Sequence, residues 1–170
     1  MKDEDLLRIL KDSLSAYSPV KVDKNRIKIS LQAETLHDVA EKIFSIGFNY
    51  LHTICATDYP DKQEFELNYI VGSMDDDKRN NIIMLVTRIP KSNPSLRTVS
   101  DVWKAAKLEE REEFEMLGVN FLGNDELQKL YLPEDWNEIP PLLKEYKLKR
   151  WVDEERNRHG LVIEKVEHEH

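Results

Sequence analysis

The chain has 170 residues, and its 25 Lys and Arg against 33 Asp and Glu give a net charge of −8. A chain of this size buries roughly 70% of its unfolded surface, which is enough for one sizeable core. The acidic balance argues against a nucleic-acid-binding protein, because phosphate contacts require clustered Lys and Arg. A single cysteine excludes a disulfide scaffold, a thiolate zinc site and a cysteine-ligated iron–sulfur cluster within the chain.

The negative charge is concentrated in the second half. Residues 1–100 hold 15 acids and 14 bases, whereas residues 101–170 hold 18 acids and 11 bases. The same half contains all three tryptophans, Trp103, Trp136 and Trp151. The longest apolar run, Ile82–Val86, is far shorter than the ~20 residues that span a bilayer, and the acidic first residues are unlike a signal peptide. We therefore expect a cytoplasmic, soluble chain.

Three elements are predicted before residue 35. Leucines at helical spacing predict a helix from Asp3 to Ala16. The polar turn 23–25 then separates the runs Val20–Val22 and Arg26–Leu31, and the second run alternates apolar and polar residues as a half-buried strand does.

The best-defined predicted helix follows Thr35. Thr35 is expected to cap it, and Gly47 stands where the residue after a helix adopts a positive φ. Its apolar face consists of Leu36, Val39, Ala40, Ile43 and Phe44.

A hairpin and an inner strand complete the first part of the chain. Asn49–Thr57 and Glu64–Val71 read as the hairpin, and Ile82–Arg88 is apolar on both faces, so it should lie inside the sheet. The pattern predicts an α+β domain over residues 1–97, with two helices packed on a mostly antiparallel sheet whose strand order stays open.

The second half has a different pattern. A short helix is expected to open at Thr98, and a second one to cover Leu108–Leu117 and end at Gly118. Beyond residue 123, prolines prevent any long element. We predict an extended helix-and-turn segment over 98–146, lying across its own domain or a partner subunit, and a C-terminal tail over 147–170.

The acid-rich stretch 109–115 is the main candidate for chemistry. Glu112 and Glu115 share a helix face and offer a carboxylate pair for a divalent metal, but the second helix with Glu-x-x-His that a di-iron site needs is missing. A solvated helix face, on which Arg111 pairs with Glu115, is the favoured interpretation.

The remaining candidates are weaker. His168 and His170 could bind a metal, but a frayed tail is favoured. Cys55, between Ile54 and Ala56, is predicted to be a small buried hydrophobic residue rather than a reactive thiol. Because the sequence contains no glycine-rich phosphate loop, Gly-x-Ser-x-Gly or His-Glu-x-x-His motif, we expect no active site in the chain itself.

Residues 98–146 carry an ordered series of motifs. They are Thr98-Val-Ser-Asp-Val-Trp-Lys-Ala-Ala, Glu110-Arg111-Glu112, Phe114-Glu115-Met116-Leu117-Gly118, Val119-x-Phe121-x-Gly123, Leu127-x-x-Leu130-x-Leu132-Pro133-Glu134-Asp135-Trp136 and Pro140 before Lys144-Glu145-Tyr146. This series resembles the 30-kDa subunit family of respiratory complex I and of related membrane-bound NiFe hydrogenases. Asn124 and Lys129 replace the His and Arg that are usual there, and Pro141-Leu-Leu-Lys-Glu145 replaces the common Pro-Leu-Arg-Lys-Asp ending, which favours a hydrogenase-type complex.

The resemblance implies a structural subunit of an ion-translocating oxidoreductase, in the peripheral arm on the cytoplasmic face of the cell membrane. It implies no cofactor and no metal, a large catalytic subunit and a small iron–sulfur subunit as partners, and membrane contact only through those partners. Arg111, between two glutamates, is expected to bridge across or within an interface. The predicted partner-binding residues are Trp103, Glu110, Arg111, Glu112, Phe114, Phe121, Leu132 and Trp136.

Several alternatives stay open on this evidence. The tryptophans are about as well explained by the chain's own core as by an interface. The parent complex could instead be a NADH:quinone oxidoreductase or a sulfur-reducing complex. Two other classes of function are a freestanding enzyme that uses the Glu110–Glu115 carboxylates with a divalent metal, and a transient assembly adaptor.

Overall fold

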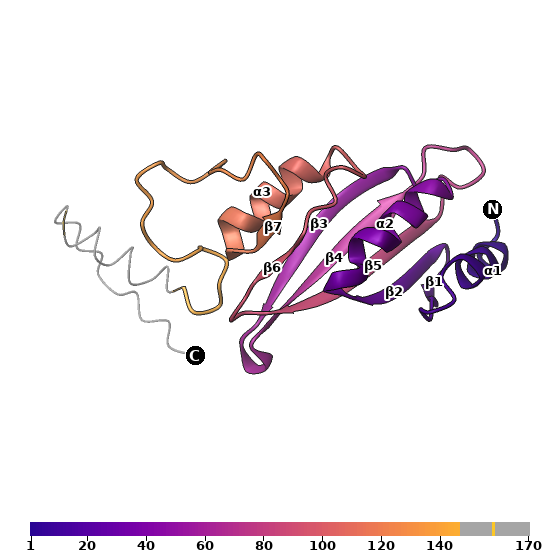
Figure 1. Cartoon of the computed structure of the whole chain (residues 1–170), viewed down its shortest axis with the longest axis horizontal. Helices are drawn as coiled ribbons and strands as arrows, with labels where there is room; N and C mark the ends of the chain where they lie inside the picture. Colours follow the sequence, from indigo (N-terminus) through magenta and orange to yellow (C-terminus); the bar gives the residue numbers. More distant parts are fainter. Residues whose placement is uncertain (147–157, 159–170) are drawn as a thin grey trace, which may run out of the picture.

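The computed structural model describes residues 1–146 and Arg158, and it is built on a five-stranded sheet in the order β1-β2-β5-β4-β3 (Figure 1). The strands are β1 (Val20–Asp23), β2 (Arg26–Gln32), β3 (Tyr50–Tyr59), β4 (Glu64–Gly72) and β5 (Ile82–Pro90). The β2–β5 pair is parallel and the other three pairs are antiparallel. This confirms the predicted α+β fold, and β5 occupies the middle of the sheet, as its continuous apolar run indicates.

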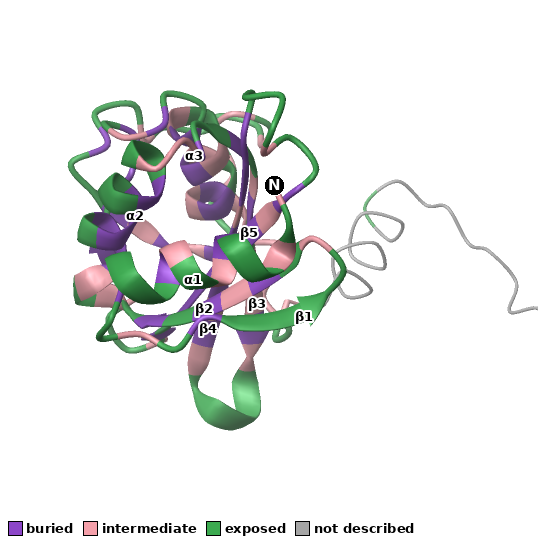
Figure 2. Cartoon of the chain, turned by 90° about the vertical axis from the view of Figure 1, so that its right-hand side faces the viewer, coloured by how far each residue is buried: buried purple, intermediate pink, exposed green. Residues whose placement is uncertain are grey.

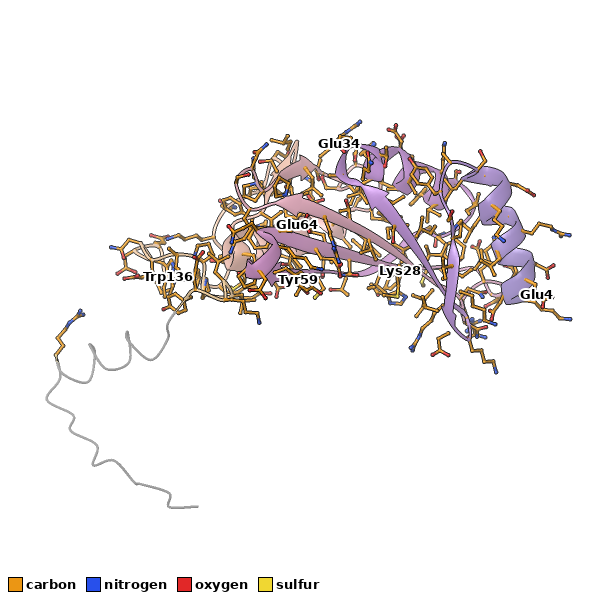
Figure 3. All side chains as sticks on the ribbon, turned by 90° about the horizontal axis from the view of Figure 1, so that it is seen from below. Glu4, Lys28, Glu34, Tyr59, Glu64 and Trp136 are labelled. Atoms are coloured by element: carbon orange, nitrogen blue, oxygen red, sulfur yellow. The ribbon has the colours of Figure 1, made fainter. Side chains whose placement is uncertain are left out.

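One face of the sheet carries the hydrophobic core. Alternate side chains of β2, β4 and β5 are buried there, and the helices α1 (Asp3–Ser13) and α2 (Leu36–Ser45) cover them (Figure 2). The fully buried residues on this face include Ile27, Ile29, Leu67, Tyr69, Ile83 and Leu85 from the strands and Leu6, Leu10, Val39, Ala40 and Ile43 from the helices. The opposite face carries polar side chains, among them the labelled Lys28 and Glu64 in Figure 3, and the Arg88–Glu66 ion pair at 2.7 Å.

The two ends of α2 differ in how well the sequence predicts them. A 3₁₀ turn (η1, Ala33–Thr35) precedes the helix, and the Thr35 hydroxyl donates to the Gln32 carbonyl at 2.9 Å. Thr35 therefore does not cap the helix through its side chain, and that prediction is wrong. At the other end Gly47 has a φ of 100°, and the Phe48 N–H bonds to the Ile43 carbonyl, as expected for a glycine that ends a helix.

A turn η2 (Pro60–Lys62) closes the β3–β4 hairpin, and the other remaining elements lie beyond β5. The short strands β6 (Ser95–Arg97) and β7 (Asn120–Leu122) pair in parallel, and the helix α3 (Ala106–Leu117) lies between them in the chain. Residues 98–105 form turns rather than the separate helix that was expected. Gly118 ends α3 with a φ of 79°, as predicted. The segment that follows has turns and no long element up to residue 146, which matches the expected helix-and-turn architecture.

The helix α3 lies along β3, at the edge of the sheet, while α1 lies near β1 at the other edge (Figure 1). The chain from residue 98 to residue 146 is thus gathered on the β3 side. The candidate site is built there.

Candidate functional site

The acidic helix α3 does not expose most of its glutamates to solvent. The side chains of Glu110, Glu113 and Glu115 are buried, and only Glu112 of the five glutamates between 109 and 115 is classed as exposed. Successive residues of a helix are rotated by about 100°, so neighbouring glutamates point to different surroundings. The predicted solvent-facing interpretation is therefore wrong, because each buried carboxylate accepts hydrogen bonds from another part of the chain.

Glu109 and Glu113 bind backbone N–H groups at the outer edge of β3. The Glu109 carboxylate accepts from the Ile54 N–H at 3.0 Å and from the Thr53 hydroxyl at 2.8 Å, and the Glu113 carboxylate accepts from the Ala56 N–H. These two N–H groups are two residues apart in β3 and point away from β4. Unpaired edge N–H groups otherwise invite pairing with another chain. The two glutamates, one helical turn apart, close this stretch of the edge.

Burial has its clearest electrostatic effect at Glu113. Loss of solvent raises the pKa of this carboxyl to about 7, the Glu112 and Glu109 charges add to the rise, and the Ala56 N–H opposes it. The group is thus half protonated near neutral pH in the folded chain, while its ordinary value is 4.5.

Cys55 differs from its prediction. Its side chain is exposed, because successive side chains of a strand point to opposite faces and the neighbouring Ile54 side chain is the buried one. Partial desolvation raises the pKa of the thiol, and the nearby Glu113 and Glu112 charges raise it further. The thiolate is disfavoured, so the expectation of an unreactive thiol still fits although the expected burial does not.

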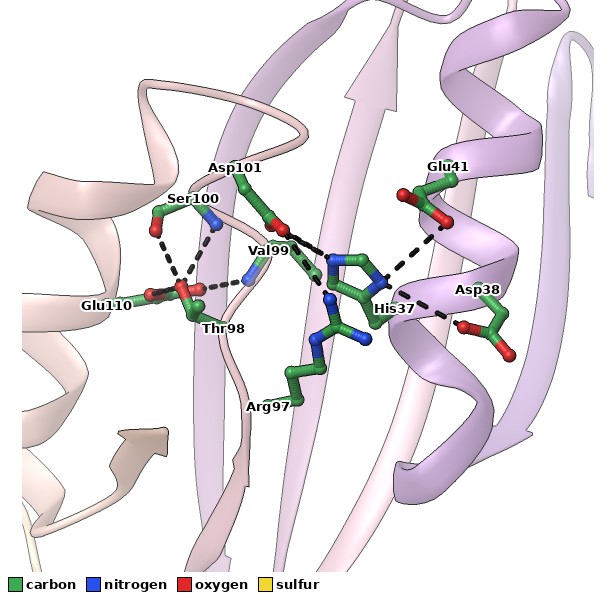
Figure 4. A network of polar contacts seen from close by, with 9 residues as sticks. All are labelled: His37, Asp38, Glu41, Arg97, Thr98, Val99, Ser100, Asp101 and Glu110. Atoms are coloured by element: carbon green, nitrogen blue, oxygen red, sulfur yellow. Dashed lines mark hydrogen bonds and ion pairs between the residues drawn. The ribbon is translucent and has the colours of Figure 1, made fainter. Parts of the chain in front are cut away.

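Glu110 organises the turn that enters the segment. Its carboxylate accepts from the Thr98 hydroxyl and from the Val99 N–H at 2.9 Å (Figure 4). It also accepts from the Asn124 side-chain amide at 2.9 Å. Burial raises the pKa of Glu110, and these three hydrogen bonds only partly offset the rise. Asn124, one of the departures from the family pattern, thus has a defined structural role.

Arg111 and Glu115 hold the stretch 128–132. The Arg111 guanidinium donates to the carbonyls of Gln128 and Lys129, at 3.2 and 3.1 Å. Glu115 does not pair with Arg111 but accepts the N–H groups of residues 130, 131 and 132, at 3.0, 2.9 and 2.7 Å. The bridge expected of Arg111 is therefore made within the chain.

Two lysines fix the rest of the loop. The Lys107 ammonium contacts Asp125 and Glu126, each at 2.9 Å. The Lys129 ammonium donates to three backbone carbonyls, those of Pro133, Glu134 and Trp136. An ammonium group with three donors suits this arrangement, which gives a physical reason for lysine at the second departure.

The tryptophans divide between core and surface. The Trp103 side chain is buried, its indole N–H donates to the Phe48 carbonyl at 3.1 Å, and Phe44 meets it edge-on. Trp136 is half-buried, with its ring 5.9 Å from that of Tyr146. Trp151 lies outside the described residues, as do His159, His168 and His170.

The eight predicted partner-binding residues fall into two groups. Trp103, Glu110 and Phe121 are enclosed by the chain itself, which is the alternative that the sequence left open. Glu112 is exposed, and the half-buried members are Arg111, Phe114, Leu132 and Trp136. A partner-binding role for these five accessible residues stays a prediction.

Two tethers were missed from the sequence. The buried Asp58 accepts the Lys144 N–H at 2.9 Å and pairs with Lys91 at 3.1 Å, so it ties the end of the segment to β3. His37 of α2 bonds to Asp101 (Figure 4). The available signals were an aspartate directly after a predicted strand and a histidine in the predicted helix that follows Thr35.

The outer surface of the segment carries exposed apolar side chains. Those classed as exposed between residues 98 and 146 are Leu108, Leu122, Tyr131, Ile139 and Leu142. Tyr131 and Leu142 are 62% and 58% exposed, yet both donate a backbone N–H inward, to Glu115 and to the Met116 carbonyl. Their backbones are fixed while their side chains face outward, as suits a binding surface.

The glutamates of α3 offer no shared metal site. Glu112 points to solvent and Glu115 is occupied by backbone N–H groups. Among the described residues, the group close enough to share an ion is His37, Asp38 and Glu41, on α2. Within the same part of the chain, no helix has both the length and the apolar character needed to cross a bilayer.

These observations define a class: an α+β protein whose C-terminal segment is held along one sheet edge by the side chains of a single helix. The chain belongs to the family described as respiratory-chain NADH dehydrogenase, 30 Kd subunit, whose pattern matches residues 29–152. The predicted family is thereby confirmed.

One relative and two solved structures are similar to this chain. One subunit of the F(420)H(2) dehydrogenase of Methanosarcina mazei is 32% identical over 122 residues, which are 71% of this chain and 75% of that protein. The structure of the membrane-bound sulfane sulfur reductase, an archaeal respiratory membrane complex, contains a chain with a TM-score of 0.83 at 20% identity, over 98% of this chain and 96% of that one. A trypsin-resistant fragment of Nqo5 gives 0.61 at 24% identity, over 74% and 98%. The two structures show the shared fold.

Replacing Glu115 by Ala tests whether this side chain holds the backbone of residues 130–132. Glu115→Ala should lower the free energy of unfolding by about 2–3 kcal/mol, because three N–H groups lose a charged acceptor. The amides of residues 130–132 should exchange faster with solvent, as measured by hydrogen exchange. Glu112→Ala, on the exposed side of the same helix, should change stability by less than about 0.5 kcal/mol. Unchanged protection of the three amides would show that Glu115 does not hold them.

The raised pKa of Glu113 predicts a pH-dependent stability. Between its ordinary value of 4.5 and about 7, the unfolded chain has lost a proton that the folded chain keeps, so stability falls as pH rises. The loss attributable to this group is about 3 kcal/mol. Glu113→Gln, which can still accept from Ala56, should flatten this dependence and make the chain more stable than the unmodified one at about pH 8. Thermal unfolding across this range, with Glu112→Gln as the control, measures it, and an unchanged slope for Glu113→Gln contradicts the assignment.

Proposed function

We propose that the chain is a structural subunit, without a redox cofactor of its own, in the cytoplasmic peripheral arm of a membrane-bound, ion-translocating oxidoreductase complex. Its partners are a large catalytic subunit and a small iron–sulfur subunit, and it reaches the membrane only through them. Family membership over residues 29–152 carries this proposal.

The geometry supports a docking role. The carboxylates of Glu109, Glu110 and Glu115 on α3 accept hydrogen bonds from the chain's own backbone. The segment 98–146 is fixed from within and presents apolar side chains outward. Apolar and aromatic residues on a rigid frame bind a partner at low entropic cost.

For the parent complex we propose a membrane-bound hydrogenase, on the basis of Asn124 and Lys129 in the family motif. A second candidate is an F420H2 dehydrogenase-type complex, which the 32% identity to the Methanosarcina mazei protein favours. The two differ in their redox partners, so composition separates them. Purifying the complex through a tag on this chain should yield nickel and hydrogen-dependent activity in the first case, and a nickel-free complex that oxidises reduced F420 in the second.

The docking surface is tested by a double variant. Tyr131→Ser with Leu142→Ser removes two outward side chains but keeps the backbone N–H groups that bond inward. Incorporation into the complex should fall by at least about tenfold, as for anchor residues of an interface, while the melting temperature of the isolated chain stays unchanged. Recovery of the large and small subunits with the tagged chain, quantified by mass spectrometry, measures this effect.

The matched control lies on the opposite edge of the sheet. Val20 and Val22 of β1 are 54% and 50% exposed, so Val20→Ser with Val22→Ser removes similar apolar surface far from α3. This variant should assemble normally. If it is the one excluded from the complex, the docking surface lies at β1; if neither pair matters, the segment 98–146 does not carry the interface through these residues.

A further inference from the structure

His37 lies at an unusual place for a polar side chain. It is in the first turn of α2, between Leu36 and Val39, and is only 2% exposed. Its Nε2 atom lies 3.0 and 2.9 Å from the two carboxylate oxygens of Asp101. Because an ionised carboxylate can only accept, Nε2 carries the hydrogen of this bond.

The other ring nitrogen has no partner. Nδ1 is buried and makes no hydrogen bond within the described residues, yet it faces two carboxylates, with Asp38 Oδ1 at 4.0 Å and Glu41 Oε2 at 3.9 Å (Figure 4). These separations are too long for hydrogen bonds. The buried Nδ1 atom is therefore aimed at two carboxylate groups with no hydrogen-bond partner between them. Such an arrangement is stabilised by a cation placed between them.

We infer that His37 Nδ1, Asp38 and Glu41 form a binding site for one divalent transition-metal ion, with Zn²⁺ as the best fit. Each residue offers one ligand atom, and the three atoms lie within 4.8 Å of one another. Zn²⁺ binds imidazole nitrogen and carboxylate oxygen at about 2.0–2.2 Å, so two of its ligands are about 3.4 Å apart at a tetrahedral angle and about 4 Å apart at wider angles. The separations of 4.0 and 3.9 Å from Nδ1 to Asp38 and Glu41 fall in this range, and the two carboxylate oxygens, which lie within 4.8 Å of each other, must move closer to share the ion.

Small rotations complete the site. The side chains of Asp38 and Glu41 are 73% and 63% exposed, so both can move toward the ion, whereas the buried ring of His37 is held by Asp101. The exposed acids also give the ion a path from solvent, and water can supply the fourth ligand. A nitrogen ligand favours Zn²⁺ over Mg²⁺, which prefers oxygen.

Asp101 has the position of a supporting residue. A histidine that binds a metal usually donates its other N–H to a carboxylate, which fixes the ring and increases the basicity of the ligating nitrogen. Asp101 belongs to the turn that Glu110 holds, so the ion would join α2 to the start of the segment 98–146. Its role is structural and adds no redox chemistry to the proposed function.

Zinc titration of the full chain tests the site. The terminal His168 and His170 are replaced by Ala first, so that they do not contribute ligands. Calorimetry with ZnCl₂ should show one ion per chain, the melting temperature should rise with Zn²⁺ and not with Mg²⁺, and Co²⁺ should give the visible absorption of a nitrogen- and oxygen-ligated ion. No saturable binding of Zn²⁺ overturns the inference and leaves His37 as a hydrogen-bond partner of Asp101 alone.

Matched variants locate the ion. Glu41→Gln removes one exposed ligand and leaves the His37–Asp101 bond intact, so the affinity for Zn²⁺ should fall by at least about tenfold. Glu34→Gln, an exposed acid of the preceding turn outside the group, should bind Zn²⁺ like the parent. Asp101→Asn should weaken binding by about 10–100-fold, as loss of a supporting carboxylate does. Equal affinity of Glu41→Gln and Glu34→Gln places the ion elsewhere and overturns the assignment.

Discussion

The arrangement of the C-terminal half depends on one constraint, the unpaired N–H groups along the outer edge of β3. A sheet edge left open invites association with another chain, and this protein satisfies part of it with the carboxylates of Glu109 and Glu113 rather than with a further strand. That contact fixes both the position of α3 and its rotation about its own axis. Once the helix is fixed, its other side chains reach defined places: Glu110 meets the turn at residues 98–100, and Arg111 and Glu115 meet the stretch 128–132.

The excess negative charge of the second half thus has a structural explanation. Segments without regular secondary structure still have backbone N–H groups to satisfy, and a carboxylate can accept two or three of them at once. Glu115 accepts three such groups, those of residues 130–132, and Asp58 accepts one, that of Lys144, together with the Lys91 ammonium. The segment is held by side chains instead of by a ladder, so its own side chains are released from pairing and can face outward. The same choice has a cost, because burying the carboxyl of Glu113 raises its pKa to about 7 and opposes folding at higher pH.

Sequence patterns predicted the parts of the fold that are set by local rules. The apolar run of β5, the alternation in β2 and the glycines at 47 and 118 each follow from short-range periodicity or from a positive φ. The errors arose where a distant partner decides. The exception is Thr35, a good capping residue whose hydroxyl bonds locally, back to Gln32. Five glutamates in one helix resemble a solvated face, and only the position of β3 and the loop reveals that three of them are buried. Cys55 is exposed because of which face of an edge strand it lies on, and the apolar neighbours do not show this.

The candidate site also shows what the residues of the family motif do. Glu110, Arg111, Gly118 and Gly123, which carry much of the resemblance, act within the chain: two hold backbone groups, and the two glycines have φ values of 79° and 97° that side chains rarely adopt. A motif of this kind specifies how the segment 98–146 packs along the edge of the sheet. It can therefore be shared by subunits whose partners differ. We propose that selectivity for a particular complex resides partly in side chains that the backbone hydrogen bonds leave exposed, such as Tyr131 and Leu142, where substitution changes the outer surface and leaves the inward hydrogen bonds intact. The family is therefore readable from the sequence because this internal framework repeats, whereas the parent complex is a proposal that rests on departures from the family pattern, such as Asn124 and Lys129.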